Sequence, residues 1–152
     1  MTLEELARNF VYKSDGDKDT WRILKPDDLV GDCDDYALTA LYIVCGGDMD
    51  KFWEMLESKS ASIAYYKLPS GSGHAVLHVE GRYIDNNYRT WFTPPHSWVY
   101  GFDFTVDRIR EKMGVPKPTV QVTAKTPEKP SKKVLVGIGI AVALLGLVVL
   151  GG

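Results

Sequence analysis

The chain has 152 residues, of which 45% are hydrophobic, and a formal net charge of -2. This length accommodates one domain of ordinary size. The slightly acidic composition lacks the basic field that phosphate binding requires, so we expect no nucleic-acid partner.

The N-terminal segment predicts a helix over residues 3–10. Its apolar residues have helical spacing, and Thr2 and Glu5 occupy capping-box positions. The polar run 13–19 that follows is typical of a loop. Because the chain opens on an acidic amphipathic stretch, without a basic region followed by an apolar one, we expect no signal peptide.

A second helix is expected to begin at Cys33. Apolar residues recur every three or four positions up to Val44, and the pair Gly46-Gly47 ends the pattern as a glycine C-cap does. Asp32 or Gly31 is the expected N-cap. Cys33 and Cys45 lie twelve positions apart on this helix, which is about 18 Å and beyond disulfide reach. Two unpaired thiols are therefore predicted.

The middle of the chain predicts a small antiparallel sheet. A short helix over 48–56 precedes strands at 61–68, 73–79 and 82–86, with a tight turn at Glu80-Gly81. The segment 88–100 is aromatic and broken by prolines, which favours a loop, and a last helix is expected over 103–113. The predicted fold class is therefore α+β, with N-terminal helices packed on a short antiparallel sheet.

The C-terminal part of the sequence predicts a linker and a membrane anchor. Residues 115–133 are rich in Pro and Lys, which is typical of an extended linker, so the domain is expected to span 1–114. Residues 134–150 carry no charged or polar side chain, and at about 1.5 Å per residue they cross most of a roughly 30 Å hydrocarbon layer. We expect a single-pass transmembrane helix that contacts the lipid bilayer.

The same segment bears on orientation and assembly. Lys132 and Lys133 precede the apolar residues, which by the positive-inside tendency favours a soluble domain on the cytoplasmic side. Small residues such as Gly139 and Ala143 recur at spacings near four, so self-association through this face is one expectation.

Cys33 is the candidate nucleophile. In the first turn of its helix, free N–H groups and the positive end of the dipole stabilise a thiolate. The neighbouring carboxylates of Asp32, Asp34 and Asp35 favour the protonated thiol, so a nearby imidazolium would be needed. The alternative is that Cys33 is a small buried residue beneath a helix cap.

The hairpin 73–86 supplies candidate bases and a carboxylate. If Glu80 and Gly81 form its two-residue turn, then His74, His78 and Asp85 share one face of the sheet. A base oriented by a carboxylate is what an acyl-transfer cysteine requires. Pairing geometry alone leaves both histidines open as the base.

Three segments together resemble the transglutaminase-like superfamily, in particular its bacterial cysteine-peptidase branch with a papain-like fold. They are Gly31-Asp32-Cys33-Asp34-Asp35-Tyr36-Ala37, Gly73-His74-Ala75-Val76-Leu77 and Tyr83-Ile84-Asp85-Asn86. In that family the cysteine opens a helix, the histidine opens the next strand and the aspartate lies on the strand after it. The resemblance covers roughly residues 21–87. It implies that Cys33 is the nucleophile, His74 the base and Asp85 the orienting acid. The short separation of His74 and Asp85 and the small domain depart from the family pattern.

Two tryptophans are candidate substrate-binding residues. The family takes a second oxyanion donor from upstream of the cysteine, but no Gln or Asn lies between Val11 and Asp32. The indole N–H of Trp21 is the candidate that remains, against a packing role in the core. Trp91 lies in the aromatic segment after Asp85, where it would wall a substrate groove or close the core. We expect no cofactor and no metal, because the cysteines and histidines lack paired zinc-ligand spacing.

The sequence therefore favours a membrane-anchored thiol hydrolase, a peptidase or amidase, or an acyltransferase. Its expected partner is a peptide or protein amide, such as a cell-wall peptide or a membrane-proximal protein, and a phage or bacterial origin fits a compact enzyme on a tether. The alternative is a catalytically inactive binding or assembly module, for instance in a virion, whose hydrophobic tail is the working part. A third reading makes the glycine-rich apolar segment a pore-forming or lytic element.

Overall fold

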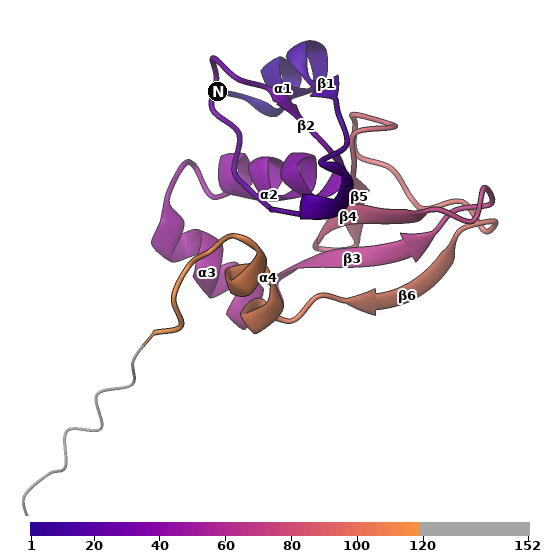
Figure 1. The fold of residues 1–152 in the computed structure, drawn as a ribbon. Coiled ribbons are helices and arrows are strands. Elements are labelled where there is room, and N and C mark those ends of the chain that lie inside the picture. The colour runs from indigo at the N-terminus through magenta and orange to yellow at the C-terminus, as the bar shows by residue number, and fades with distance from the viewer. Residues whose placement is uncertain (119–152) are drawn as a thin grey trace, which may run out of the picture. The chain divides into compact units, whose positions relative to one another are not determined.

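The computed structural model describes residues 1–118, which form an α+β unit with an antiparallel sheet (Figure 1). The α-helices are α1 (Leu3–Asn9), α2 (Cys33–Val44), α3 (Met49–Glu57) and α4 (Val106–Lys112). The strands are β1 (Val11–Tyr12), β2 (Val30–Gly31), β3 (Ala61–Lys67), β4 (Gly73–Val79), β5 (Arg82–Ile84) and β6 (Val99–Asp103), and η1 (Gly16–Lys18) is a short 3-10 turn. The α+β class is confirmed.

Local sequence signals account for the helix ends. Thr2 and Glu5 form the expected capping box at the start of α1, so two otherwise free backbone N–H groups are satisfied there. Helix α2 begins at Cys33 as predicted, and Gly46 and Gly47 follow it with positive φ. Asp32 is the N-cap of α2, but its side chain makes no capping hydrogen bond.

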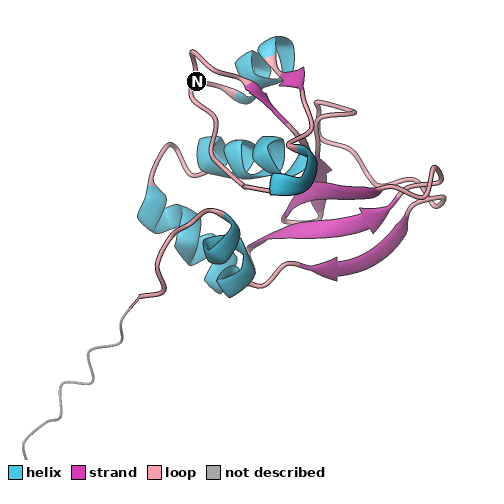
Figure 2. Cartoon of the chain, viewed as in Figure 1, coloured by secondary structure: helices cyan, strands magenta, loops and turns pink. Residues whose placement is uncertain are grey.

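Helix α2 is the centre of the main core. It packs against β3 and β4, as Figure 2 shows, with α1 and α3 against its other sides. Residues 34–41 of α2 are all buried, and Tyr36, Leu38 and Leu41 are fully inaccessible to solvent. At about 25 cal/mol per Å² of apolar surface removed from water, such residues supply most of the stabilising free energy.

The larger sheet has the strand order β5-β4-β3-β6, with antiparallel pairs throughout. In the hairpin, Val79 pairs with Arg82 and His78 with Tyr83, which confirms the predicted register. Strand β5 ends at Ile84, two residues earlier than expected, because the chain turns at Asp85.

Three features differ from the sequence prediction. Residues 99–103 form the edge strand β6, which takes up the last two residues of the expected loop 88–100 and the first residue of the expected helix 103–113. It pairs with β3 across a register shift. Helix α4 therefore begins at Val106, after this strand, where the Thr105 side chain caps the N–H of Arg108. The short parallel pair β1-β2 was not expected, because two-residue strands leave no periodic pattern.

The aromatic segment after β5 covers the second face of the sheet. Val76, Tyr66 and Ala64 form a small cluster there, with Phe92 and Trp98 packed against it. These aromatic residues close the sheet face, as residues in such loops often do.

The expected membrane helix at 134–150 and nearly all of the expected linker lie outside the described residues. Within residues 1–118, no helix is long and apolar enough to cross a membrane.

Candidate active site

Cys33 lies at the junction of β2 and α2, where the chain leaves Gly31 and enters the helix. A Cβ atom on Gly31 would lie 2.4 Å from Oδ2 of Asp35, so only glycine allows this close approach. The Cys33 side chain is half-buried, and it has no disulfide partner, as predicted. A backbone hydrogen bond from Ala75, the residue after His74, reaches the thiol and lowers its pKa. The thiol therefore lies against the first residues of β4.

His74 and Asp85 form the strongest polar contact of this region. Nε2 of His74 lies 2.7 Å from Oδ2 of Asp85, and both side chains are buried. The other carboxylate oxygen of Asp85 accepts backbone N–H groups from Asn87, at 3.0 Å, and Tyr88, at 2.7 Å. Three donors thus hold this carboxylate, and it fixes the orientation of the imidazole.

Cys33 and His74 line one open cavity of about 580 Å³. Because Nε2 of His74 is engaged by Asp85, Nδ1 is the ring nitrogen that remains for a proton exchanged with the thiol. The residues that line the cavity are Tyr12, Cys33, Leu68, Ser72, Gly73, His74, Asn86, Asn87 and Arg89.

His78, the other candidate base, is used elsewhere in the hairpin. Its Nε2 accepts the backbone N–H of Gly81 at 3.1 Å, and its ring stacks on Tyr83 with centroids 4.5 Å apart. It does not line the cavity that contains Cys33. The register places His74 and His78 on one strand, but only His74 contacts Asp85 within the described residues.

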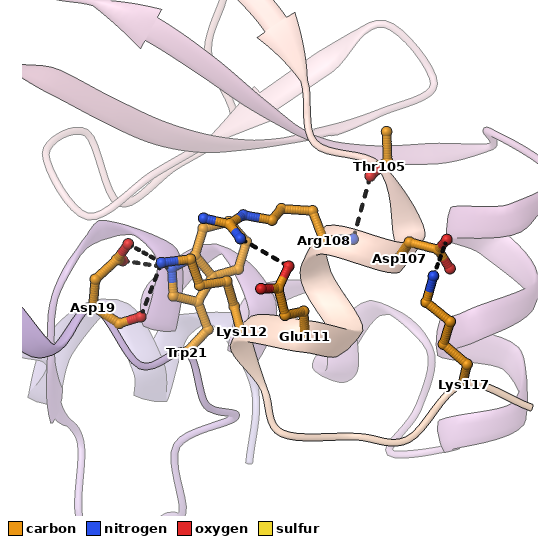
Figure 3. A network of polar contacts seen from close by, with 8 residues as sticks. All are labelled: Asp19, Trp21, Thr105, Asp107, Arg108, Glu111, Lys112 and Lys117. Carbon is orange, nitrogen blue, oxygen red and sulfur yellow. Dashed lines mark hydrogen bonds and ion pairs between the residues drawn. The ribbon is translucent and has the colours of Figure 1, made fainter.

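Trp21 does not line the cavity with Cys33. Its indole Nε1–H donates to Asp19 at 3.0 Å, and its ring packs edge-on against Phe104 with centroids 4.7 Å apart. Figure 3 shows the same Asp19 held by Lys112 from α4. The structure therefore gives Trp21 a packing role, in which it joins the N-terminal loop to the C-terminal helix.

Trp91 also lies apart from Cys33. It lines a different cavity of about 570 Å³, between α1 and the segment after β5, and the guanidinium of Arg82 lies 4.7 Å from its ring centroid. Trp98, from the same aromatic segment, contacts a residue of the site: its ring centroid lies 5.4 Å from that of His74. Trp98 supports the imidazole without lining the cavity.

Burial and negative charge hold the thiol in its protonated form. Desolvation by burial is the main reason that the pKa of Cys33 is raised to about 12. The hydrogen bond from Ala75 opposes this shift, and the carboxylates of Asp34 and Asp32 add to it. Asp34 and Asp32 thus favour the protonated thiol, as the sequence predicted. A free thiolate at pH 7 requires a compensating cation, and His74 is the titratable base that shares the cavity.

Asp34 is buried among other acidic side chains. Burial raises its pKa to about 9, and the neighbouring Asp32 side chain is the second cause of that shift. Asp32, Cys33 and Asp34 each offer a ligand atom within 4.8 Å of the others. Burial favours a neutral Asp34, and the three donors come from consecutive residues, so the cluster gives no metal-site assignment.

Three residues of the cavity were missed by the sequence reasoning. Asn87 approaches Nε2 of His74 at 3.3 Å, and Arg89 is among the residues that line the cavity. Tyr12 lines the cavity because β1 pairs with β2, which places Tyr12 opposite Gly31, two residues before Cys33. Burial and the charge of Cys33 raise the pKa of Tyr12, so its hydroxyl remains a donor at neutral pH. For Asn87 and Arg89, their position just after Asp85 was the one sequence feature that could have indicated them. No such feature indicated Tyr12.

The fold and these contacts define an α+β domain in which a cysteine and a histidine line one cavity and an aspartate holds the histidine. No family model, curated protein or solved structure matches the chain.

Proposed function

We propose that this protein is a thiol hydrolase, acting on an amide or related acyl bond through Cys33, His74 and Asp85. The observation that supports the proposal most directly is the buried 2.7 Å contact between His74 and Asp85, at a cavity that His74 shares with Cys33. An imidazole held by a carboxylate beside a thiol is the arrangement that nucleophilic cysteine catalysis needs.

The reaction follows from the atoms available. The Cys33 thiol transfers its proton to Nδ1 of His74, and the sulfur attacks the substrate carbonyl carbon. The resulting imidazolium protonates the leaving nitrogen as the C–N bond breaks, which leaves a thioester on Cys33. Water, deprotonated by His74, then attacks the thioester carbonyl, so that the acid is released and the thiol is restored. An amine in place of water gives acyl transfer.

The oxyanion formed in each step needs two donors. The backbone N–H of Cys33, which lies in the first turn of α2 and so has no acceptor within the helix, is the first. For the second we propose the Tyr12 hydroxyl in place of the Trp21 indole. Tyr12 lines the cavity, whereas the indole N–H of Trp21 already binds Asp19.

The family resemblance and the apolar C-terminal sequence extend this proposal. They fit a transglutaminase-like cysteine peptidase or amidase that is tethered to a bilayer through residues 134–150 and acts on a peptide close to the membrane. A cell-wall peptide and a membrane-proximal protein both suit such a tether, in a bacterium or in a phage particle.

One observation favours a second function, that of a non-catalytic binding or assembly module. The pKa of Cys33 is raised to about 12, first by burial and then by two neighbouring carboxylates. A thiol in that environment is inert unless His74 accepts its proton. If the proton transfer does not occur, the same fold keeps only a binding role.

A thiol-reactive acyl probe separates these functions. We expect the probe to label Cys33 of the full-length chain, and His74→Ala to abolish that labelling. Cys45 is an internal control, because it is buried and its Sγ lies 3.5 Å from the sulfur of Met55. Equal, slow labelling of both cysteines in the wild type, unchanged by His74→Ala, would rule out the hydrolase.

A further inference from the structure

Arg89 is a half-buried cation at the candidate active site without an acidic partner. It lines both the cavity of Cys33 and His74 and the neighbouring cavity between α1 and the segment after β5. Within residues 1–118, no carboxylate forms an ion pair with it, whereas the other sheltered arginine, Arg110, pairs with Glu57 at 3.0 Å. A sheltered guanidinium loses hydration, and a counter-charge normally offsets that cost.

The guanidinium of Arg89 is held in place by backbone carbonyl groups. Nε donates to the Asn86 carbonyl and Nη1 to the Ala7 carbonyl, each at 3.0 Å, and Cζ lies 5.8 Å from the ring centroid of Phe10. Of the five guanidinium N–H groups, one on Nη1 and both on Nη2 then have no partner among the described residues. These form the planar fork that binds a carboxylate bidentately.

The backbone at Arg89 is unusual as well. Its φ is +59°, a left-handed conformation that glycine or asparagine adopts at lower cost than a long side chain. The turn is closed by the Arg89 N–H, which donates to the Asp85 carbonyl at 2.9 Å. A strained backbone at a position that carries a charged side chain in a cavity points to a functional requirement for that side chain.

We propose that Arg89 binds a carboxylate of the substrate, so that the substrate class is an acyl compound with a carboxylate close to the scissile bond. This inference rests on the proposed function of Cys33 and names the substrate for that site. The same turn carries Asp85 and Arg89, so the group that orients the base and the group that binds the substrate are set by one backbone segment. Preorganisation of this kind lowers the entropy cost of binding.

Two sources of the carboxylate fit this chemistry, the C-terminal carboxylate of a peptide and an acidic side chain next to the scissile amide. Both place the charge within a few bonds of an amide carbonyl. The cavity of about 580 Å³ has room for a short peptide segment.

The first test compares two alkylating agents of the same size on the full-length chain. Iodoacetate carries a carboxylate and iodoacetamide is neutral, and each loses iodide as the Cys33 sulfur bonds to its CH₂ carbon. We expect the rate ratio of iodoacetate to iodoacetamide to be higher at Cys33 than for free N-acetylcysteine. It should fall at least about tenfold in Arg89→Gln, in line with the loss of a charged hydrogen bond, and stay largely intact in Arg89→Lys.

Arg8→Gln is the matched control. Arg8 is exposed and lines the neighbouring cavity with Arg89, but it does not line the cavity of Cys33. The ratio should be unchanged in this variant. If Arg89→Gln leaves the ratio at its wild-type value while Cys33 still reacts, the carboxylate proposal is overturned and the hydrolase proposal survives.

The second test does not depend on the thiol. N-acetylglycine and the α-amide of N-acetylglutamate, which carry the terminal and the side-chain carboxylate respectively, are titrated into the wild-type protein while the Arg89 Nε–H resonance is recorded by NMR. A saturable shift with either ligand, absent with N-acetylglycinamide, supports the proposal, and the tighter ligand identifies the source of the carboxylate. No shift with both overturns it, even if Cys33 proves unreactive or Arg89→Gln fails to fold.

Discussion

Asp85 holds His74 by a single nitrogen, with Nε2 of the ring 2.7 Å from Oδ2 of the carboxylate. His74 lies on β4 and Asp85 directly after β5 of the same hairpin, and both side chains are buried. The contact therefore sets both the orientation and the tautomer of the imidazole, because the carboxylate accepts only from a protonated Nε2.

Replacement of Asp85 by asparagine should separate orientation from charge. In Asp85→Asn the side-chain oxygen can still accept the N–H groups of Asn87 and Tyr88, but the new amide nitrogen donates to Nε2 of His74 and forces the proton onto Nδ1. His74 then cannot accept the Cys33 proton. We expect Asp85→Asn to fold, and alkylation of Cys33 at pH 7 to fall at least about tenfold, within the usual range for loss of a general base.

The tautomer itself can be measured in the same variant. Long-range ¹H–¹⁵N spectra of the His74 ring should show a protonated Nε2 in the wild type and a protonated Nδ1 in Asp85→Asn. Unchanged spectra together with unchanged alkylation would mean that Asp85 has only a structural role.

Removal of the Asp34 carboxylate should make the thiol more acidic. The pKa of Cys33 is raised to about 12, first by burial and then by the charges of Asp34 and Asp32. Because the pKa of Asp34 is itself raised to about 9, Asp34→Asn removes one of these charges only near and above that pH. The alkylation rate of Cys33 at pH 9 should rise roughly two- to tenfold, since one pKa unit changes the thiolate fraction about tenfold. Iodoacetamide kinetics from pH 6 to 10 measure this.

Asp50→Asn is the matched control for that experiment. Asp50 also lies in the first turn of a helix, α3, but it belongs to another element and lies outside the cavity of Cys33. Its replacement should leave the pH profile of Cys33 unchanged. An equal effect of both substitutions would show that net charge, and not the local field, controls the thiol.

Asp35 should make the folded state less stable as the pH rises. Its side chain is inaccessible to solvent, and burial raises its pKa to about 6, against about 3.9 in an unfolded chain, although the N–H of Arg22 donates to its Oδ1 at 2.8 Å. Because the folded state binds this proton more tightly, the stabilisation is fully present below about pH 4. It is lost as the pH rises through 6, and the total is roughly 2–3 kcal/mol.

Urea unfolding of the wild type and of Asp35→Asn at pH 4, 5, 6 and 7 tests this dependence. The difference in free energy of unfolding between the two proteins should change by that amount from pH 4 to 7. Asp27→Asn, at an exposed position, should track the wild type throughout. A difference that stays constant with pH would show that Asp35 keeps an ordinary pKa in the folded protein.

Tyr12 and Trp21 should differ sharply as oxyanion donors. Tyr12→Phe removes a hydroxyl that lines the cavity, and the single-turnover rate of 4-nitrophenyl acetate hydrolysis should fall about 10- to 100-fold, somewhat less than for a fully buried donor. Trp21→Phe keeps an aromatic ring against Phe104 and loses only the N–H that binds Asp19. Its rate should stay within about twofold of wild type. A larger loss of rate in Trp21→Phe than in Tyr12→Phe would instead identify Trp21 as the oxyanion donor.

Sequence patterns predicted the elements that carry the site because those signals are local. The apolar spacing after Cys33 and the paired glycines at its end defined α2, and the turn at Glu80-Gly81 fixed the register of the hairpin. The same register placed His74 and His78 on one face, so it gave two candidate bases and no means of choosing between them.

The family resemblance favoured His74 over His78, and the tertiary structure supplied the contact that separates them and completed the cavity. His78 is satisfied by Gly81 and Tyr83 within its own hairpin, whereas the turn after β5 directs Asp85 to His74. Tyr12 reaches the cavity through a two-residue parallel pair too short to leave a periodic signal. Helix spacing and turn chemistry depend on residues a few positions apart. The packing of Cys33, His74, Tyr12 and Arg89 around one cavity depends on contacts between segments far apart in the chain, which no local pattern encodes.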